Sequence, residues 1–163
     1  MKNLVVGLTG ASGIRYGVRL LEQPVLRNHY DEIYVIVTRA AERVALYEEG
    51  IRSLYDRIRG MGYEEIYGEE DWDSPLASSS SLVGTDMVIV PASLNTVAKL
   101  SNGIQDNVLL RAASAVLRLR GRLVVVVRET PLSTIDLYNL YVLSTAGAII
   151  LPDPPASTMA RRR

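Results

Sequence analysis

Residues 5–17 read VVGLTGASGIRYG, an apolar strand pattern that runs straight into the turn Thr9-Gly10-Ala11-Ser12-Gly13. A helical pattern begins directly after Gly13. Two explanations fit a turn built from such small residues. It is either a tight strand-to-helix connection with no ligand, or a turn kept free of side chains so that a phosphate reaches backbone N–H groups.

Outward from this stretch, strand patterns alternate with helical patterns along the chain. The Val/Ile runs show no alternation with polar residues, which indicates strands covered on both faces. The prediction is a three-layer α/β fold, Rossmann-like (flavodoxin-like), with a mostly parallel central sheet. One domain is expected over residues 1–155, followed by a short tail at 156–163. Strands are predicted at 2–8, 32–38, 86–93, 122–131 and 147–152, with a short one near Ile66. Helices are predicted at 14–27 (interrupted by Pro24), 39–49, 95–103, 106–120 and 133–145.

Composition excludes several classes of function. Acidic and basic residues balance at 18 each, so no net charge attracts nucleic acid or a membrane surface. The absence of cysteine excludes disulfides, thiolate nucleophiles and zinc–thiolate sites. The single histidine, His29, lies far from every predicted strand end, which argues against a catalytic triad or a histidine metal site. With no apolar run of membrane-spanning length, a cytoplasmic enzyme or binding protein is expected.

Hydroxyl and small residues follow most of the predicted strands. Ligands of parallel α/β sheets bind outside the carboxyl ends of the strands. Each Ser or Thr alone is explained as a helix N-cap, but several on one sheet edge favour a ligand site. The first turn lacks GxGxxG spacing and no GxxxxGK[ST] sequence occurs, whereas FMN, with a single phosphate, is compatible with it. The segments after the five long strands are TGASG, TRAAE, PASLNT, RETPLS and PDPPAS.

Three segments, GLTGASGIRYGVRLLE, PASLNTVAKLSNGIQDNVLLRAASAVL and VVVVRETPLSTIDLYNLYVLSTAGAIILP, resemble the UbiX-type flavin prenyltransferases. These belong to the homo-oligomeric flavin-containing cysteine decarboxylase superfamily, and the resemblance spans Lys2 to Pro155. It implies metal-independent transfer of a dimethylallyl group from dimethylallyl phosphate to N5 and C6 of reduced FMN. The product, prenylated FMN, is the cofactor of UbiD-type decarboxylases. A homo-oligomer, in this family a dodecamer with a flavin site shared between subunits, is also implied.

The resemblance assigns a flavin site residue by residue. Thr38 takes the place of a Ser/Thr that contacts the FMN phosphate, and Arg128 matches a flavin-binding arginine, for which the alternative is a surface arginine that closes a strand. The remaining matches are Gly10, Ala11 and Ser12 in the first turn and Ser93, Leu94, Asn95 and Thr96 after the third long strand.

The resemblance also assigns transfer chemistry. Glu48 and Glu129 match the acids that move protons, with Ser12 beside them, while Arg111 and Arg118 match cations that hold the departing phosphate. Arg118 stands where the family usually has Lys and is counted among the catalytic residues. From the sequence alone, Glu48 is also explained as a solvent-facing member of YEEG, and Glu129 as an ion-pair partner of a nearby arginine.

The C-terminal segment departs from the family pattern. Thr158 stands where a substrate-binding Tyr is expected, and no later residue takes the role of a further basic group. Two alternatives therefore stay open: an FMN-binding carrier or assembly protein without prenyl transfer, and a flavin-dependent cysteine-type decarboxylase. The decarboxylases use a His after the flavin strand and a Cys in a substrate lid, and this chain has neither in place.

Overall fold

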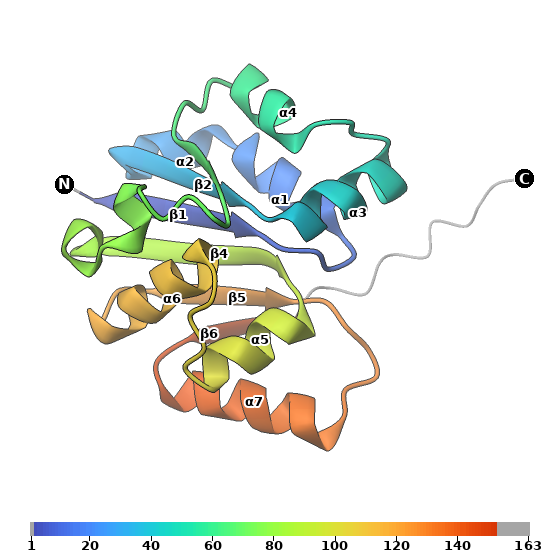
Figure 1. Ribbon diagram of the computed structural model, residues 1–163, viewed down its shortest axis with the longest axis vertical. Helices are drawn as coiled ribbons and strands as arrows, with labels where there is room; N and C mark the ends of the chain where they lie inside the picture. Colours follow the sequence, from blue (N-terminus) through green and yellow to red (C-terminus); the bar gives the residue numbers. More distant parts are fainter. Residues whose placement is uncertain (1, 153–163) are drawn as a thin grey trace, which may run out of the picture.

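In the computed structural model, which describes residues 2–152, a single sheet runs through the centre of the molecule (Figure 1). Its strand order is β3-β2-β1-β4-β5-β6, and every neighbouring pair is parallel. The predicted parallel α/β fold is confirmed. The strands are β1 (Asn3–Leu8), β2 (Glu32–Val37), β3 (Ile66–Gly68), β4 (Thr85–Ala92), β5 (Leu123–Val127) and β6 (Ile149–Pro152).

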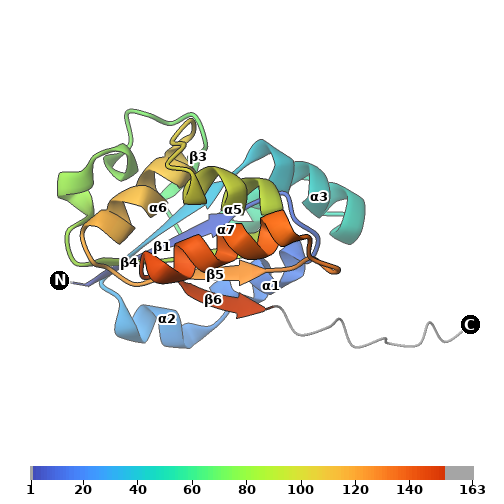
Figure 2. The same ribbon diagram turned by 90° about the horizontal axis from the view of Figure 1, so that it is seen from below.

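Helices lie on both faces of the sheet, with α5, α6 and α7 on one side and α1 and α2 on the other (Figure 2). Thr158 and the predicted tail lie outside the described residues. The helices are α1 (Ile14–Leu21), α2 (Pro24–His29), α3 (Arg39–Glu49), α4 (Leu54–Gly60), α5 (Leu94–Ser101), α6 (Val108–Arg118) and α7 (Thr134–Thr145), with two short 3₁₀ helices, η1 (Pro75–Ala77) and η2 (Ser79–Leu82).

Two predicted elements differ from the structure. The helix expected at 14–27 is two helices, because Pro24 lacks the N–H that would continue α1 and instead occupies the first turn of α2. The strand expected at 122–131 ends at Val127. Its partners there are Ala92 and Pro152, the last residues of β4 and β6, so no neighbouring strand continues the pairing.

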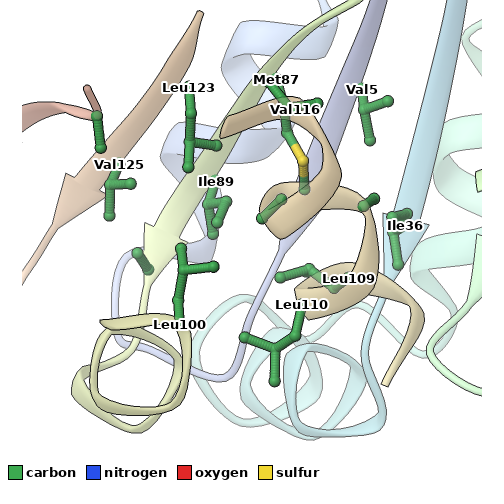
Figure 3. Packing of buried hydrophobic residues seen from close by; sticks show 14 of the residues in the cluster. Val5, Ile36, Met87, Ile89, Leu100, Leu109, Leu110, Val116, Leu123 and Val125 are labelled. Carbon is green, nitrogen blue, oxygen red and sulfur yellow. The ribbon is translucent and has the colours of Figure 1, made fainter. Parts of the chain in front are cut away.

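The core has two halves, one on each face of the sheet. Val5 of β1 points toward α6, and the next residue, Val6, points toward α1, so both are fully buried. Figure 3 shows the first half, in which Leu109 and Val116 of α6 pack over Met87 of β4. Burial on both faces explains why the strand sequences show no polar alternation.

Close packing of α1 on the sheet depends on Gly17. A Cβ at this position would lie 2.4 Å from Leu8 Cδ2 and 2.5 Å from the Val90 carbonyl oxygen. Only glycine allows the helix to approach β1 and β4 this closely. The start of α1 is thereby fixed over the carboxyl end of β1. Within residues 2–152, no helix has the length and apolar character needed to cross a bilayer.

Candidate active site at the carboxyl edge of the sheet

The turn after β1 forms the centre of the candidate site. Gly13 caps α1 with φ +94°, a left-handed conformation that favours glycine. A Cβ on Gly10 would lie 2.4 Å from Ala40 Cβ at the start of α3. Backbone geometry and packing therefore account for both glycines without a ligand. Thr9 and Ala11 are buried, which leaves Ser12 as the exposed side chain of the turn.

Glu48 contacts this turn from the last helical turn of α3. The helix extends outward from the carboxyl edge instead of returning along the sheet, so its far end lies beside the start of α1 (Figure 1). Glu48 Oε1 accepts a hydrogen bond from Ser12 Oγ at 2.5 Å, and Oε2 accepts one from the Gly13 N–H at 3.0 Å. Both bonds are charge-assisted, and the positive end of the α1 dipole favours the carboxylate. Glu48 thus takes part in the turn, although its side chain stays exposed.

Arg128 reaches the same turn from the opposite side. It follows β5 and extends past β4, which separates β5 from β1 in the sheet. Its side chain occupies the space beside Gly13, where a Cβ would lie 2.9 Å from both Arg128 Cδ and Nη1. The guanidinium carbon is 5.9 Å from the centre of the Tyr16 ring, within range of a cation–π contact. A carboxylate and a guanidinium therefore lie on either side of an exposed hydroxyl.

The loop after β4 adjoins this turn and carries four of the predicted flavin contacts. Ser93 caps α5: its Oγ accepts from the Thr96 N–H at 3.1 Å and lies 2.8 Å from Thr96 Oγ1. Leu94 is half-buried and Asn95 is exposed. The loop is attached to the first turn through Thr9, whose Oγ1 accepts from the Ser93 N–H. Thr9 directly follows β1, and nothing in the residue pattern of the turn distinguishes its hydroxyl from that of Ser12.

Thr38 has a structural role at the start of α3. Its buried Oγ1 donates to the Leu8 carbonyl at 3.0 Å and accepts from the Ala41 N–H at 3.1 Å, so it caps the helix and attaches it to β1. Beside it lies a cavity of about 270 Å³ in which Arg39 pairs with Glu70 at 2.6 Å. The other charged side chains of the cavity are the carboxylates of Glu42, Glu69 and Asp71.

The negative charge of these carboxylates would repel a phosphate group inside this cavity. Among residues 2–152, no group of three or more His, Cys, Asp or Glu side chains is placed to hold a metal ion.

The two predicted phosphate-binding arginines lie on α6, away from the turn. Arg111 Nε donates to the Ala77 carbonyl at 3.2 Å, and its Nη1 donates to Gln105 Oε1 at 3.3 Å. Arg118 is the last residue of α6 and donates to Ser79 Oγ at 3.1 Å. Just beyond it, Gly121 packs on the carbonyl of Thr85, the first residue of β4. Arg118 therefore lies at the amino edge of the sheet, opposite the turn within one chain.

The structure brings Ser12, Glu48 and Arg128 together at one point. Glu129 is exposed in the loop after β5, next to Arg128 in sequence. His29 ends α2, and its Nδ1 lies 3.2 Å from the Val25 carbonyl within the same helix.

Two comparisons of sequence agree on the class of protein that this chain resembles. The Flavoprotein family model matches residues 1–160. A flavin prenyltransferase UbiX from Thermoplasma acidophilum is 44% identical over 152 residues, which cover 93% of this chain and 80% of that protein.

The similar solved structures are also UbiX or UbiX-like proteins. AnUbiX in complex with FMN and dimethylallyl pyrophosphate has a TM-score of 0.85 and 32% identity, and the match covers 95% of this chain and 79% of that one. A dodecameric FMN-dependent UbiX-like decarboxylase from Escherichia coli has a TM-score of 0.84 and 32% identity, covering 96% and 82% respectively.

Proposed function

The chain belongs to the UbiX flavin prenyltransferases within the flavoprotein family, and from this premise we propose that it joins a dimethylallyl group to reduced FMN. The donor is dimethylallyl phosphate, and the bonds form at N5 and C6 of the flavin without a metal ion. The product is prenylated FMN, which is passed to a UbiD-type decarboxylase in the cytoplasm.

The observation that carries this proposal is the contact between Ser12 and Glu48 beside Arg128. Loss of phosphate from an allylic ester leaves a delocalised carbocation that bonds to N5 as N5 loses its proton. The bond to C6 forms after a proton is added to the remaining C=C bond of the prenyl group, and C6 then loses its own proton. Glu48 is a carboxylate that accepts such a proton, and Ser12 and the Gly13 N–H orient it. Arg128 supplies positive charge on the other side of the turn.

The residues of the turn fit FMN. Thr9 and Ala11 point into the protein, and Ala40 and Arg128 occupy the space beside Gly10 and Gly13, so Ser12 is the exposed side chain of the turn. We assign the flavin ring to this exposed side of the turn, beside Ser12. We assign Thr38, the Ser93–Thr96 segment and Arg128 to flavin binding, and Glu129 to the acid–base chemistry with Glu48. Reduced FMN, when bound, supplies the nucleophilic positions.

The departing phosphate is assigned to Arg111 and Arg118. Because Arg118 lies at the amino edge of its own sheet, it reaches a flavin site only in a neighbouring subunit. The proposal therefore includes a homo-oligomer, and the dodecameric Escherichia coli relative supports it.

The decisive experiment is anaerobic incubation with reduced FMN and dimethylallyl phosphate, followed by mass spectrometry of the released flavin. The expected product is FMN carrying one five-carbon unit. Release of unmodified FMN alone indicates a carrier, and release of CO₂ from a peptide with a C-terminal cysteine indicates a decarboxylase; either result overturns the proposal.

Glu48→Gln tests the assigned acid in the same assay. It should keep FMN affinity but slow product formation by about a hundredfold or more, the usual scale for one acid–base group. Glu49→Gln is the matched control, because Glu49 is the exposed neighbour on the same helix and makes no contact with Ser12 or Gly13 among the described residues. Equal rates for the two variants would remove Glu48 from the chemistry.

A further inference from the structure

Tyr16 has a fixed position at the start of α1. It is the third residue of the helix, and its backbone N–H donates to the Gly13 carbonyl at 3.0 Å. Its ring is half-buried and packs against the half of the core that lies under α1. The helix has little room to shift, because Gly17 already packs directly on the sheet. The Tyr16 ring is therefore a rigid surface beside the turn after β1.

The Arg128 side chain lies against both this ring and Gly13. A Cβ on Gly13 would lie 2.9 Å from Arg128 Cδ and 3.1 Å from Tyr16 Cδ2, so the three residues meet at one place. The guanidinium carbon is 5.9 Å from the centre of the ring. Arg128 directly follows β5 and belongs to the loop before α7. Holding a long arginine side chain in one rotamer costs conformational entropy, so a loop arginine needs such contacts to keep one position.

Arg15 contacts the same ring, but in a different way. Its guanidinium carbon is 5.4 Å from the ring centre. Arg15 is exposed and directly precedes Tyr16 on α1, so this contact connects no other part of the molecule. Arg128, in contrast, joins the loop after β5 to α1. Only the contact with Arg128 can therefore carry the position of the ring across to the other side of the turn.

We propose that Tyr16 is a positioning residue for flavin binding, and that it acts by holding the Arg128 guanidinium beside the turn. This inference rests on the proposed function, in which Arg128 binds the flavin. A group that is ordered before its ligand arrives loses less conformational entropy when the ligand binds. The ring of Tyr16 thus raises the affinity for FMN through Arg128.

Dissociation constants for FMN test this role in a double-mutant cycle. Tyr16→Leu should weaken FMN binding about two- to fivefold, the range expected for one exposed cation–π contact. Tyr16→Phe keeps the ring and should bind FMN like the wild type. Arg128→Met removes the charge but keeps a long side chain, and in that background Tyr16→Leu should have no further effect. Arg15→Ala should keep the wild-type affinity.

Tyr63→Leu is the matched control for loss of a tyrosine that contacts an arginine. The Arg27 guanidinium carbon lies 4.6 Å from the centre of the Tyr63 ring. Tyr63 lies just before β3 begins, at the amino edge of the sheet and opposite the turn. This variant should lose thermal stability, because Tyr63 is buried, and should leave FMN affinity unchanged.

The same cycle on urea unfolding of the flavin-free protein tests the contact without a ligand. Tyr16→Leu and Arg128→Met should be coupled by about two- to fivefold in the unfolding constant. Absence of this coupling would overturn the proposal, because the ring would then not hold the guanidinium. Cooperative unfolding of each variant also shows that it folds.

The outcomes separate this role from the proposed function. If the wild-type chain binds FMN but the effects of Tyr16→Leu and Arg128→Met on affinity are additive, the positioning role alone is overturned. A loss in Tyr16→Phe or Arg15→Ala equal to that in Tyr16→Leu overturns it as well. A wild-type chain that binds no FMN overturns the proposed function, and this role with it.

Discussion

The Thr9 hydroxyl accepts a hydrogen bond from the Ser93 backbone N–H at 2.9 Å and donates one to the Pro91 carbonyl at 2.7 Å. One buried side chain thereby connects the turn after β1 with the loop after β4. Both of these segments carry proposed flavin contacts. The distance between the two halves of the proposed site is therefore fixed by a residue that need not touch the flavin.

Replacing Thr9 with Val should weaken FMN binding about tenfold, or about 1.4 kcal/mol. Valine has nearly the same shape but leaves the Ser93 N–H and the Pro91 carbonyl without their partner, so the two segments separate. Thr9→Ser keeps the hydroxyl and should restore most of the affinity. Isothermal titration calorimetry measures both variants. Equal losses for Val and Ser would mean that the methyl group, not the hydroxyl, determines the geometry.

Gly13→Ala should lower both stability and FMN affinity. The new Cβ requires a strained φ of +94° and meets Arg128 at 2.9 Å, so the guanidinium must move. Gly147→Ala is a matched control, because its φ is +109° but nothing lies within 4 Å of the added Cβ. Both variants should lose thermal stability, and only Gly13→Ala should lose FMN. Parallel loss of FMN in both would show that backbone strain alone is responsible.

Ser12→Leu should abolish FMN binding while the melting temperature stays close to that of the wild type. Ser12 is exposed, so the larger side chain costs little in folding but covers the open surface of the turn. Ser12→Ala is the control and should retain FMN. Copurification of Ser12→Leu with a full complement of FMN would place the flavin elsewhere.

Arg118→Ala should weaken use of the allylic phosphate and leave FMN affinity unchanged. Its position at the amino edge predicts complementation between subunits. After unfolding and refolding together, equal amounts of Arg118→Ala and Glu48→Gln should recover about a quarter of wild-type activity, because that share of sites receives both intact residues from two chains. If both residues acted within one chain, no mixed site would be intact and the mixture would stay inactive.

Alkaline pH should destabilise the fold partly through Tyr30. Burial and the hydrogen bond to the Asp86 carboxylate raise the pKa of Tyr30 from 10.0 to about 12. As pH rises, the unfolded chain loses this phenolic proton first, so the stabilisation is complete below pH 10 and is lost towards pH 12. Melting temperatures between pH 8 and about 12 should fall less steeply for Tyr30→Phe. An unchanged slope would assign the alkaline loss to other tyrosines.

The sequence predicted the elements whose signals are local. The bounds of α3 were correct because Thr38 supplies an N-cap and Gly50 ends the helix in a left-handed conformation. The Val/Ile runs identified the parallel sheet because strands that are buried on both faces are apolar at every position. β6 is equally apolar but is exposed on one face. No residue in the sequence marks the point at which helices stop covering the sheet.

Long-range placement was beyond the residue patterns alone. In YEEG only the family resemblance singled out Glu48 over Glu49, and the direction of α3 explains why Glu48 is the one that contacts the turn. Arg118 lies at the far edge because α6 runs back along the sheet, which no residue pattern states. Thr9 and Ser12 are both hydroxyl residues of one turn, and only the buried position of Thr9 separates their roles.

The outward course of α3 places its last turn outside the packed core. The first turns of the helix are anchored by buried Ala41 and Ala45, whereas Leu46, Tyr47 and Glu48 near its end are exposed. Substitutions near that end can therefore alter the proposed acid and its neighbours at little cost in folding free energy. The residues at this end of α3 can be replaced at little cost in folding, and they include the proposed acid and its neighbours. The chemistry of the site can therefore change there while the fold is kept.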